Sequence, residues 1–409
     1  MRRTNNEDAH IERLADDAES FRRFGHLFVV ADGMGGHAVG ELASKLAIDT
    51  VAHLMFQREG ARPQVLEEAI TTANATIHDR GSQNRDFERM GTTCTVLNLT
   101  ASGAVLGHVG DSRAYRIRRD RVDQLTFDHS VEWELRKRHP GRVDSELLRQ
   151  HRNVITRSLG PEPEMAVDIE GPIPILPGDR FLLCSDGLTG LVADEELGTI
   201  VRVLPPKRAV RLLVDLANLR GGNDNCTVTV VDIGEAPHGV PLPEIEPDEP
   251  VWTLPWPWIA GWLLIAAVIL LGVFIWASGN RLVGMLFVVF AGAASIPVVV
   301  GTMRDRDRAL RSIGDDDDSR TMRNRPHATA IAMPLTELLA ELQSAAEDLT
   351  AAAREDNWPM DWQTLETASK AARDAADERR YAVALKEQGQ AIHTLMRGLH
   401  AMRSADAAS

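Results

Sequence analysis

One stretch of the sequence, from Phe28 to Ser44, places a carboxylate between an apolar run and a group of glycines. The apolar run Phe28–Ala31 favours a short buried strand, because glycines follow it at once. Asp32 would then lie at the end of that strand, and the glycines after it would let the backbone turn sharply and approach whatever Asp32 holds. A carboxylate beside accessible backbone groups is suited to a hard cation and a phosphate. The alternative is a turn in which the aspartate only caps a helix.

Three further aspartates repeat this arrangement: Asp111 after Gly110, Asp186 before Gly187, and Asp224 in a glycine-containing run. Each lies beside an apolar run that favours a strand. Histidine and cysteine are absent from these positions, so the donors are oxygen atoms, which favour Mg²⁺ or Mn²⁺ over zinc. Each aspartate taken alone is also compatible with turn capping. The shared glycine context favours a metal site.

The first residues, MRRTNNEDA, add a second kind of charged group. Arg3 stands four residues before Glu7, and Asp8 follows directly. A pair of carboxylates with a nearby guanidinium could hold a metal ion and a phosphate together, because arginine binds phosphate through paired hydrogen bonds. A polar run of this kind is also typical of a solvated terminus, and it does not resemble a secretory signal.

Apolar spacing predicts the elements that must hold these residues. Stripes with a period near 3.6 predict amphipathic helices, and alternation predicts strands. The expected helices are Glu41–Gln57, Gln64–Arg80 and Val210–Leu219, and the expected strands are Thr92–Thr100, Ala104–His108, Ala114–Ile117, Arg180–Cys184 and Cys226–Ile233. Ile11–Phe24 is expected to be a polar loop, and Asp128–Gly160 a charged, partly helical flap.

Length and charge limit the classes of protein to which the chain can belong. Its 409 residues leave room for two or three domains. The formal net charge of −14 argues against a nucleic-acid binder, which would present a basic face. Cys94, Cys184 and Cys226 lie far apart in apolar runs without metal-type spacing, so we interpret them as small buried side chains in a reducing compartment.

The motifs taken together resemble the metal-dependent protein phosphatases of the protein phosphatase 2C (PPM) family in its bacterial form. The resemblance covers Met1–Gly234 and rests on RTNNEDA, ADGMGGH, MGTTCTVL, GHVGDSRAY, LTFDHS, VITRSLG, LLCSDGLTGLV and GGNDNCTVTVV. It implies an α+β fold, a four-layer αββα sandwich of two antiparallel sheets flanked by helices, with a two-metal site at one end. It also implies hydrolysis of phosphoserine and phosphothreonine in proteins by a water that two Mn²⁺ or Mg²⁺ ions activate.

The resemblance also implies roles for individual residues. Asp32 would bridge the two ions, and the carbonyl of Gly33 would bind one of them. Glu7 would join the shell of that ion, directly or through water. Asp186 and Asp224 would hold the other ion, so that Asp32, Asp186 and Asp224 form the catalytic set.

Further roles follow from the flanking motifs. Asp8 would be a supporting metal ligand, and Arg3 matches the arginine that grips the substrate phosphate. Asp111 matches a residue that many members use, with Asp186, for a third and weaker ion. His129 in LTFDHS is expected to belong to the flap structure.

Two departures from the family pattern bear on these expectations. Met34 stands where some eukaryotic members carry a histidine proposed as general acid, so the leaving group must be protonated from elsewhere. The family also has a strand before the position of Arg3, whereas here Met1 is only two residues away. Either that edge strand is missing or the assigned start is too late, and our hypothesis is that the natural protein starts upstream.

The sequence after the phosphatase-like part predicts a membrane anchor. Glu235–Pro257 is rich in proline and acid and reads as an extended linker. Ile259–Ala277 and Leu282–Gly301 are uncharged and long enough to cross a bilayer, although a buried hairpin of a soluble domain is the alternative. Four arginines follow the second run, whereas Arg281 stands alone in the turn, so both flanks are expected in the cytoplasm.

The remaining residues predict a helical tail that could sense a signal, dimerise or bind a partner. The expected domains are a phosphatase domain at 1–234, a linker at 235–257, a transmembrane hairpin at 258–302, a charged linker at 303–333 and a helical C-terminal region at 334–409. The predicted function is a membrane-anchored serine/threonine phosphoprotein phosphatase. The alternatives are a catalytically weak phosphatase-like adaptor that acts through its tail, and a phosphatase for a small phosphoester.

Overall fold

The computed structural model describes residues 5–36, 38–87, 90–138, 154–234, 256–312 and 326–406. The chain divides into two compact units. The larger unit joins residues 1–243 with residues 322–409, and the smaller unit is residues 244–321. The phosphatase-like part and the C-terminal tail therefore belong to one body, and the apolar segment is inserted between them in sequence.

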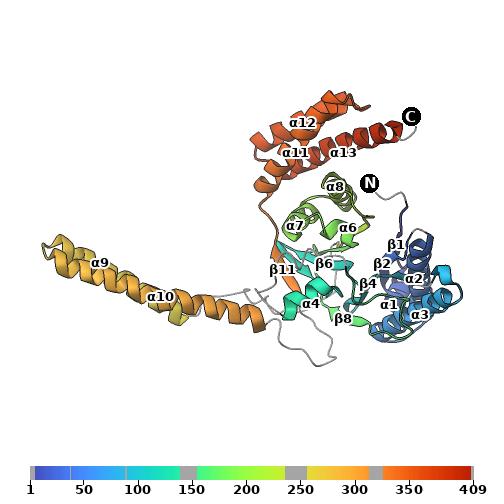
Figure 1. The fold of residues 1–409 in the computed structure, drawn as a ribbon, viewed down its shortest axis with the longest axis horizontal. Helices are drawn as coiled ribbons and strands as arrows, with labels where there is room; N and C mark the ends of the chain where they lie inside the picture. The colour runs from blue at the N-terminus through green and yellow to red at the C-terminus, as the bar shows by residue number, and fades with distance from the viewer. Residues whose placement is uncertain are drawn as a thin grey trace. The chain divides into compact units, whose positions relative to one another are not determined.

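The first sheet of the larger unit has six strands and follows the order β1-β2-β4-β5-β8, with β3 paired to β2 (Figure 1). Its neighbours are antiparallel. The bounds are Asp8–Arg13 for β1, His26–Met34 for β2, Gly91–Thr92 for β3, Cys94–Thr100 for β4, Gly103–Val109 for β5 and Asp168–Ile173 for β8. The strands expected at Thr92–Thr100 and Ala104–His108 thus pair as the β4–β5 hairpin, with its turn at residues 101–102.

The second sheet has five antiparallel strands in the order β10-β9-β6-β7-β11. The bounds are Arg113–Arg118 for β6, Arg121–Gln124 for β7, Arg180–Cys184 for β9, Val228–Asp232 for β10 and Ala328–Ile331 for β11. Strand β11 lies inside 303–333, where we expected a charged linker. It therefore belongs to the sheet of the catalytic unit.

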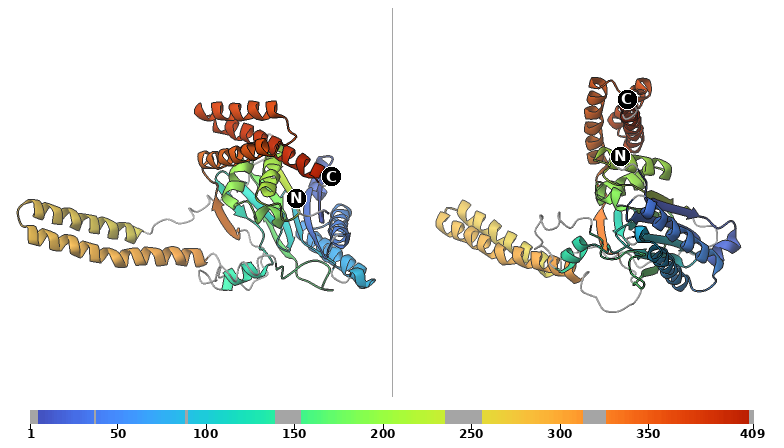
Figure 2. Two further views of the ribbon diagram at one scale, coloured as in Figure 1. Left: turned by 45° about the horizontal axis from the view of Figure 1, so that its top comes forward. Right: turned by 45° about the vertical axis from the view of Figure 1, so that its right-hand side comes forward.

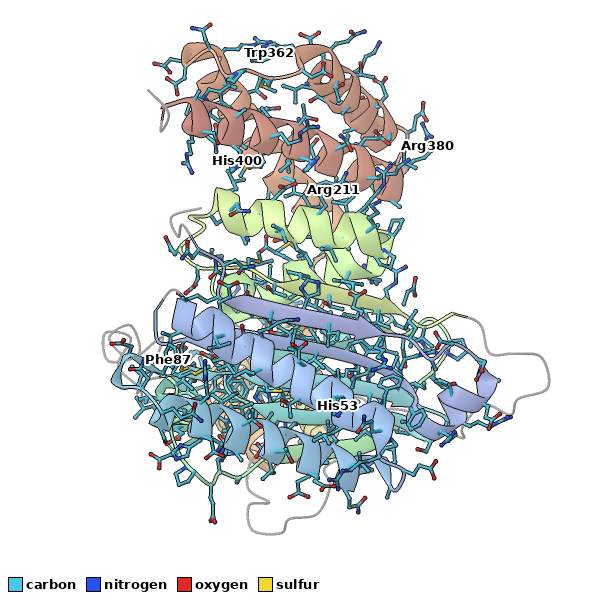
Figure 3. All side chains as sticks on the ribbon, turned by 90° about the vertical axis from the view of Figure 1, so that its right-hand side faces the viewer. His53, Phe87, Arg211, Trp362, Arg380 and His400 are labelled. Atoms are coloured by element: carbon cyan, nitrogen blue, oxygen red, sulfur yellow. The ribbon has the colours of Figure 1, made fainter. Side chains whose placement is uncertain are left out.

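Helices cover the outer face of each sheet, so that the layers run helix, sheet, sheet, helix (Figures 2 and 3). On the first sheet lie α2 (Ala38–Gln57) and α3 (Arg62–Ser82), and on the second lie α7 (Asp194–Val203) and α8 (Pro206–Leu219). Apolar side chains such as Val30, Leu106 and Phe181 fill the space between the sheets. The expected four-layer sandwich of two antiparallel sheets and flanking helices is confirmed.

The expectation of a polar loop at Ile11–Phe24 is wrong. Strand β1 pairs with β2 along its whole length, and α1 (Ala18–Phe24) follows it. The helix begins after Asp17, whose Oδ1 accepts a hydrogen bond of 2.7 Å from the backbone N–H of Ser20. Because β1 is an edge strand with one open side, its polar residues remain in water and hide the strand pattern.

The tail forms three helices, α11 (Leu335–Glu355), α12 (Trp362–Asp377) and α13 (Tyr381–Asp406). The last of them, α13, packs against α11, α12 and α8, and α11 contacts α7. Figure 3 shows this layer beyond α8, which carries Arg211. Buried tail residues such as Leu338, Leu385 and Ile392 belong to the same apolar cluster as Leu212 of α8. The tail is therefore a fifth layer on the second half of the sandwich.

The smaller unit consists of two packed helices, α9 (Trp256–Ala277) and α10 (Arg281–Ser312). The pair is tight, since a Cβ at Gly284 would lie 2.6 Å from the carbonyl oxygen of Gly272. Among the described residues, one run is long and apolar enough to cross a bilayer, Arg281–Val299, and a shorter apolar helix spans Gly261–Ala277. The proline- and acid-rich linker lies outside the described residues, apart from its last two positions, which begin α9.

Candidate active site

Strand register brings the first two carboxylates together. Asp8 of β1 lies directly opposite Asp32 of β2 in the antiparallel pair, and β2 also contacts β9 and β10 of the second sheet. The hydroxyl of Ser185, which follows β9, donates a hydrogen bond of 2.8 Å to Oδ2 of Asp8. This bond links the two sheets at the end where the acidic residues gather.

The other three aspartates come from connections between elements. Asp111 lies between β5 and β6, Asp186 is the first residue of the short helix α6 (Asp186–Thr189), and Asp224 lies between α8 and β10. Asp111 is buried, whereas Asp186 and Asp224 are half-buried. Asp111 and Asp224 therefore lie in connections next to strands, as their glycine context predicted, whereas Asp186 begins a short helix two residues after β9.

Electrostatics show that these carboxylates share one region. Burial raises the pKa of Asp32 far above its usual value, and the negative charges of four other aspartates add to the rise: Asp8, Asp186, Asp111 and Asp224. Burial likewise raises the pKa of Asp111 to about 7, with contributions from Asp186 and Asp128. Carboxylates that cannot share a site as anions need a positive charge between them to ionise together.

The donor set fits a divalent cation. Oδ1 of Asp8 and Oδ1 of Asp111 are buried and accept no hydrogen bond from the described residues. A buried oxygen without a donor costs free energy, and a hard cation would satisfy it. Within the described ranges no three His, Cys, Asp or Glu side chains already stand as a set of metal ligands.

Glu7 and Gly33 lie at the same end of the sheet. The N–H of Gly33 donates a hydrogen bond of 3.2 Å to the carbonyl of Glu7, and a Cβ at Gly33 would lie 2.1 Å from the carbonyl oxygen of Gly40. Only glycine fits there. A Cβ at Gly40 would in turn lie 2.1 Å from Oε2 of Glu7, so the Glu7 carboxylate rests on the bare backbone of Gly40.

Several residues that hold these carboxylates were not identified from the sequence. The backbone N–H of Asp32 donates a hydrogen bond of 2.9 Å to Oγ1 of Thr93. Oδ1 of Asn225 accepts a hydrogen bond of 2.9 Å from the N–H of Glu7, and Nδ2 of Asn225 donates one of 3.1 Å to the carbonyl of Asn5. Asn225 and Ser185 stand beside the acidic motifs, and adjacency was the signal that could have found them. Thr93 lies 61 residues from Asp32 in the sequence, so no local signal pointed to it.

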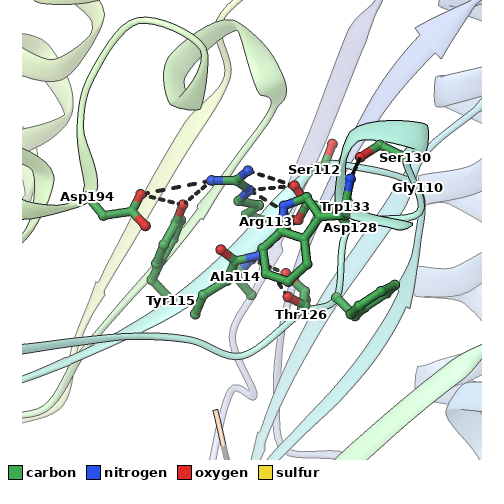
Figure 4. Close-up of polar contacts among 12 residues, drawn as sticks. Gly110, Ser112, Arg113, Ala114, Tyr115, Thr126, Asp128, Ser130, Trp133 and Asp194 are labelled. Carbon is green, nitrogen blue, oxygen red and sulfur yellow. Dashed lines mark hydrogen bonds and ion pairs between the residues drawn. The ribbon is translucent and has the colours of Figure 1, made fainter. Parts of the chain in front are cut away.

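Arg113 organises the residues beside Asp111 (Figure 4). Its Nε lies 2.8 and 3.1 Å from the two carboxylate oxygens of Asp128, and its Nη1 donates a 3.0 Å hydrogen bond to the hydroxyl of Tyr115. That hydroxyl donates a 2.9 Å bond to Asp194 at the start of α7. The loop of Asp111 is thus tied to the strand–flap connection and to the helical layer.

The remaining predicted residues have separate outcomes. His129 stacks on His108 with a centroid distance of 5.0 Å, and its Nδ1 accepts a 3.0 Å hydrogen bond from the N–H of Gly110. It therefore supports the loop of Asp111 from the segment before α4 (Val131–Arg138). Met34 is the last residue of β2. Arg3 lies outside the described residues.

Comparison with known proteins gives the context for this site. The family model for protein phosphatase 2C matches residues 4–216. A putative protein phosphatase 2C-type protein of Streptococcus pyogenes is 35% identical over 219 residues, which cover 50% of this chain and 85% of that protein. The serine/threonine protein phosphatase PstP of Mycobacterium tuberculosis is 34% identical over 249 residues, which cover 59% of this chain and 48% of PstP.

Solved structures show the same likeness. The serine/threonine phosphatase Stp1 of Staphylococcus aureus matches with a TM-score of 0.50 and 28% identity, over 57% of this chain and 91% of that one. The catalytic domain of PstP in complex with two manganese ions matches with a TM-score of 0.49 and 34% identity, over 57% of this chain and 94% of that one. The chain belongs to the protein phosphatase 2C family of serine/threonine phosphatases, which are metal-dependent hydrolases.

Proposed function

We propose that the chain hydrolyses phosphoserine and phosphothreonine in proteins with the help of Mn²⁺ or Mg²⁺. The observation that carries the proposal is the convergence of five aspartates from separate segments, whose burial and mutual charge raise the pKa of Asp32. Two bound divalent ions would lower the pKa of a coordinated water and offset charge on the phosphoryl oxygens. Asp32, Asp186, Asp224, Glu7 and the Gly33 carbonyl are the groups that would hold them.

Residues around the carboxylates would decide which oxygen atoms face the ions. Ser185 occupies Oδ2 of Asp8, so Oδ1 of that carboxylate is left for a cation. Asp111, whose Oδ1 accepts no hydrogen bond from the described residues, would support a third and weaker ion together with Asp186. We assign binding of the substrate phosphate to Arg3 because a guanidinium donates paired hydrogen bonds to a phosphate group.

Phosphate release from a phosphothreonine peptide by the full chain tests this proposal. Release should require Mn²⁺ or Mg²⁺ and stop with EDTA, and Asp186→Asn and Asp224→Asn should each lower turnover by orders of magnitude, because each removes an anionic ligand. Asp16→Asn changes an exposed aspartate of the same domain and serves as the matched control. Full activity in the two site variants would refute the assignment.

The same assay separates the two alternatives. A phosphatase for a small phosphoester would prefer that compound to the peptide. An adaptor that acts through residues 334–409 would bind a partner equally well when Asp32→Asn abolishes turnover. A partner or a second copy would have to use the outer surface of α11–α13, because their apolar faces are buried on one another and on α8.

We further propose that α9 and α10 cross the membrane and leave both flanks in the cytoplasm. Large apolar side chains are exposed along both helices, including Leu264, Phe274, Leu286 and Phe290, and a bilayer would cover them. Labelling from outside intact cells with an impermeant maleimide should modify Ser278→Cys in the turn. Ser404→Cys in the tail should react only after permeabilisation, and the reverse pattern would contradict this orientation.

A further inference from the structure

The chain enters and leaves its apolar hairpin from opposite edges of one sheet. Strand β10 ends at Asp232 on one edge of the second sheet, and β11 begins at Ala328 on the other edge, beside β7. The hairpin is therefore an insertion between two strands of the catalytic unit. The next strand that the structure describes after the hairpin, β11, is part of the sheet that holds Asp186 and Asp224 near its strand ends.

Backbone and side-chain hydrogen bonds fix β11 to β7. Its register pairs Ala328 with Gln124, and the N–H of His327 donates a 2.8 Å hydrogen bond to the carbonyl of Gln124. The hydroxyl of Thr329 donates a 2.8 Å bond to Oδ1 of Asp123, a carboxylate buried among arginines. The segment is thus held by specific polar contacts as well as by strand pairing.

The side chain of His327 faces the connection between β7 and the flap helix. Its ring meets the ring of Phe127 edge to face at a centroid distance of 5.7 Å, and its Nε2 lies 3.3 Å from Oε1 of Glu170 on β8. Phe127 in turn meets Trp133 of α4 edge to face at 5.3 Å. His327 therefore packs between β8 of the first sheet and the segment that joins β7 of the second sheet to α4.

Two short paths lead from His327 to the loop of Asp111: one begins at its backbone N–H, which bonds to Gln124, and the other at its ring, which meets Phe127. Gln124 donates through Nε2 to the carbonyl of Thr126 at 2.9 Å and to Oδ1 of Asp128 at 2.8 Å, and Asp128 holds Arg113. His129, two residues after Phe127, exchanges two hydrogen bonds with Gly110: its N–H donates to the carbonyl at 2.7 Å, and its Nδ1 accepts from the N–H.

Gly110 can make both hydrogen bonds to His129 only because its backbone adopts a conformation that other residues avoid. Its φ of +114° is in the region that favours glycine, and a Cβ there would lie 2.6 Å from Thr93. The bonds to His129 thus set the direction in which the next residue, Asp111, leaves the strand. A displacement of the Thr126–Ser130 segment would move that carboxylate away from the other aspartates.

We propose that His327, which directly precedes β11, is a positioning residue for the metal site. It holds Phe127, and through the Thr126–Ser130 segment it sets the place of the Gly110–Asp111 loop. The proposal rests on the proposed function for the identity of the bound ion. The segment that follows the hairpin thus completes the support of the metal site. The position of the hairpin in the chain is therefore linked to the arrangement of the catalytic residues.

Mn²⁺ binding by the full chain tests the proposal independently of turnover. Calorimetric titration should show that His327→Ala lowers the affinity of the weakest resolved Mn²⁺ site by about threefold to tenfold. This loss of affinity is smaller than the loss typical when a direct hydrogen-bond partner of a metal ligand is removed. In turnover assays the Mn²⁺ concentration for half-maximal rate should rise by a similar factor, with KM for the peptide unchanged. A structural role alone would lower the melting temperature without this shift.

Two further variants sharpen the test. His327→Phe keeps an aromatic ring against Phe127 and should return Mn²⁺ affinity to within about twofold of the wild type. His400→Ala removes an exposed histidine of α13 and is the matched control. Unchanged Mn²⁺ affinity in folded His327→Ala overturns the proposal, and so does a loss that His327→Phe fails to restore. If the wild type binds Mn²⁺ but hydrolyses no phosphoester, the proposed function fails while this inference is still decided by the titration.

Discussion

The two helical layers of the sandwich differ in what covers their buried side chains. On the first sheet, α2 buries one wide face that includes Ala43, Ala47, Val51 and Met55. On the second sheet, α8 buries a face of similar width, formed by Ala209, Leu212, Leu213, Asp215, Leu216 and Ala217. The helix α2 contacts strands β1, β2 and β3 and its neighbour α3, whereas α8 contacts β10 of the sheet on one side and α13 of the tail on the other.

The difference follows from what lies beyond each helix. The apolar cluster of α2 and α3 closes on strands of the first sheet, whereas the cluster of α7 and α8 continues into α11–α13. The backbone of α13 comes close to α8 at Gly389, where a Cβ would lie 3.5 Å from Leu212. The first half of the sandwich is thus complete by itself, and the second half needs the tail to cover its apolar surface.

Removal of all residues after 234 should have the largest effect, because the second half of the sandwich then loses the tail that covers it. The truncated chain exposes the outer face of α8 and the edge of β7, so it should aggregate or melt more than about 5 °C below the full chain. Differential scanning calorimetry in the same detergent measures the change. A soluble fragment with the melting temperature of the full chain would mean that the tail is an independent domain.

A matched pair of core substitutions tests whether the tail and the sandwich unfold as one core. Ile392→Ala in α13 and Ile77→Ala in α3 each remove a fully buried side chain and should each cost about 2 to 5 kcal/mol of unfolding free energy. Because the tail shares its apolar cluster with α8, both variants should shift one common denaturation curve. A separate early transition in Ile392→Ala, with the main transition unchanged, would contradict a shared core.

Local sequence signals predicted the parts of the site that depend on local structure. Strand β9 has the expected bounds, whereas β2 continues two residues past Asp32 to Met34, so Asp32 lies near the end of its strand. Strand β11 could not be predicted this way, because Ala328–Ile331 is short and pairs with a strand about 200 residues earlier. The helix expected at Val210–Leu219 is present as α8, but its sequence did not identify the tail as a partner.

The supporting residues of the site show the same limit. Ser185 holds Asp8 across the two sheets, and Thr93 holds Asp32 between neighbouring strands of the first sheet, so only the fold brings these pairs together. His327 reaches Phe127 from a segment that composition marked as a linker. The sequence therefore predicts carboxylates at turns well, but not the side chains that orient them.

Loss of the Asp111 charge should stabilise the metal-free protein. Asp111 lies in the connection between β5 of the first sheet and β6 of the second. The pKa of Asp111 is raised from 3.8 to about 7, chiefly by burial, so this group disfavours the folded state progressively as the pH rises through that range. In EDTA, Asp111→Asn should be more stable than the wild type above pH 7, by on the order of a few kcal/mol, and the gain should vanish near pH 4. Urea denaturation at several pH values measures it. A gain that is independent of pH would contradict this origin.

The smallest effect is expected at the contact between α13 and α8 outside the apolar cluster. Nδ1 of His393 lies 2.8 Å from Oδ2 of Asp215, whose pKa burial raises and His393 lowers. His393→Ala leaves a largely buried carboxyl without this partner and should cost about 1 kcal/mol of unfolding free energy. His400→Ala, an exposed change on the same helix, should cost nothing measurable. Equal effects of the two variants would show that this polar contact adds nothing to the apolar attachment of the tail.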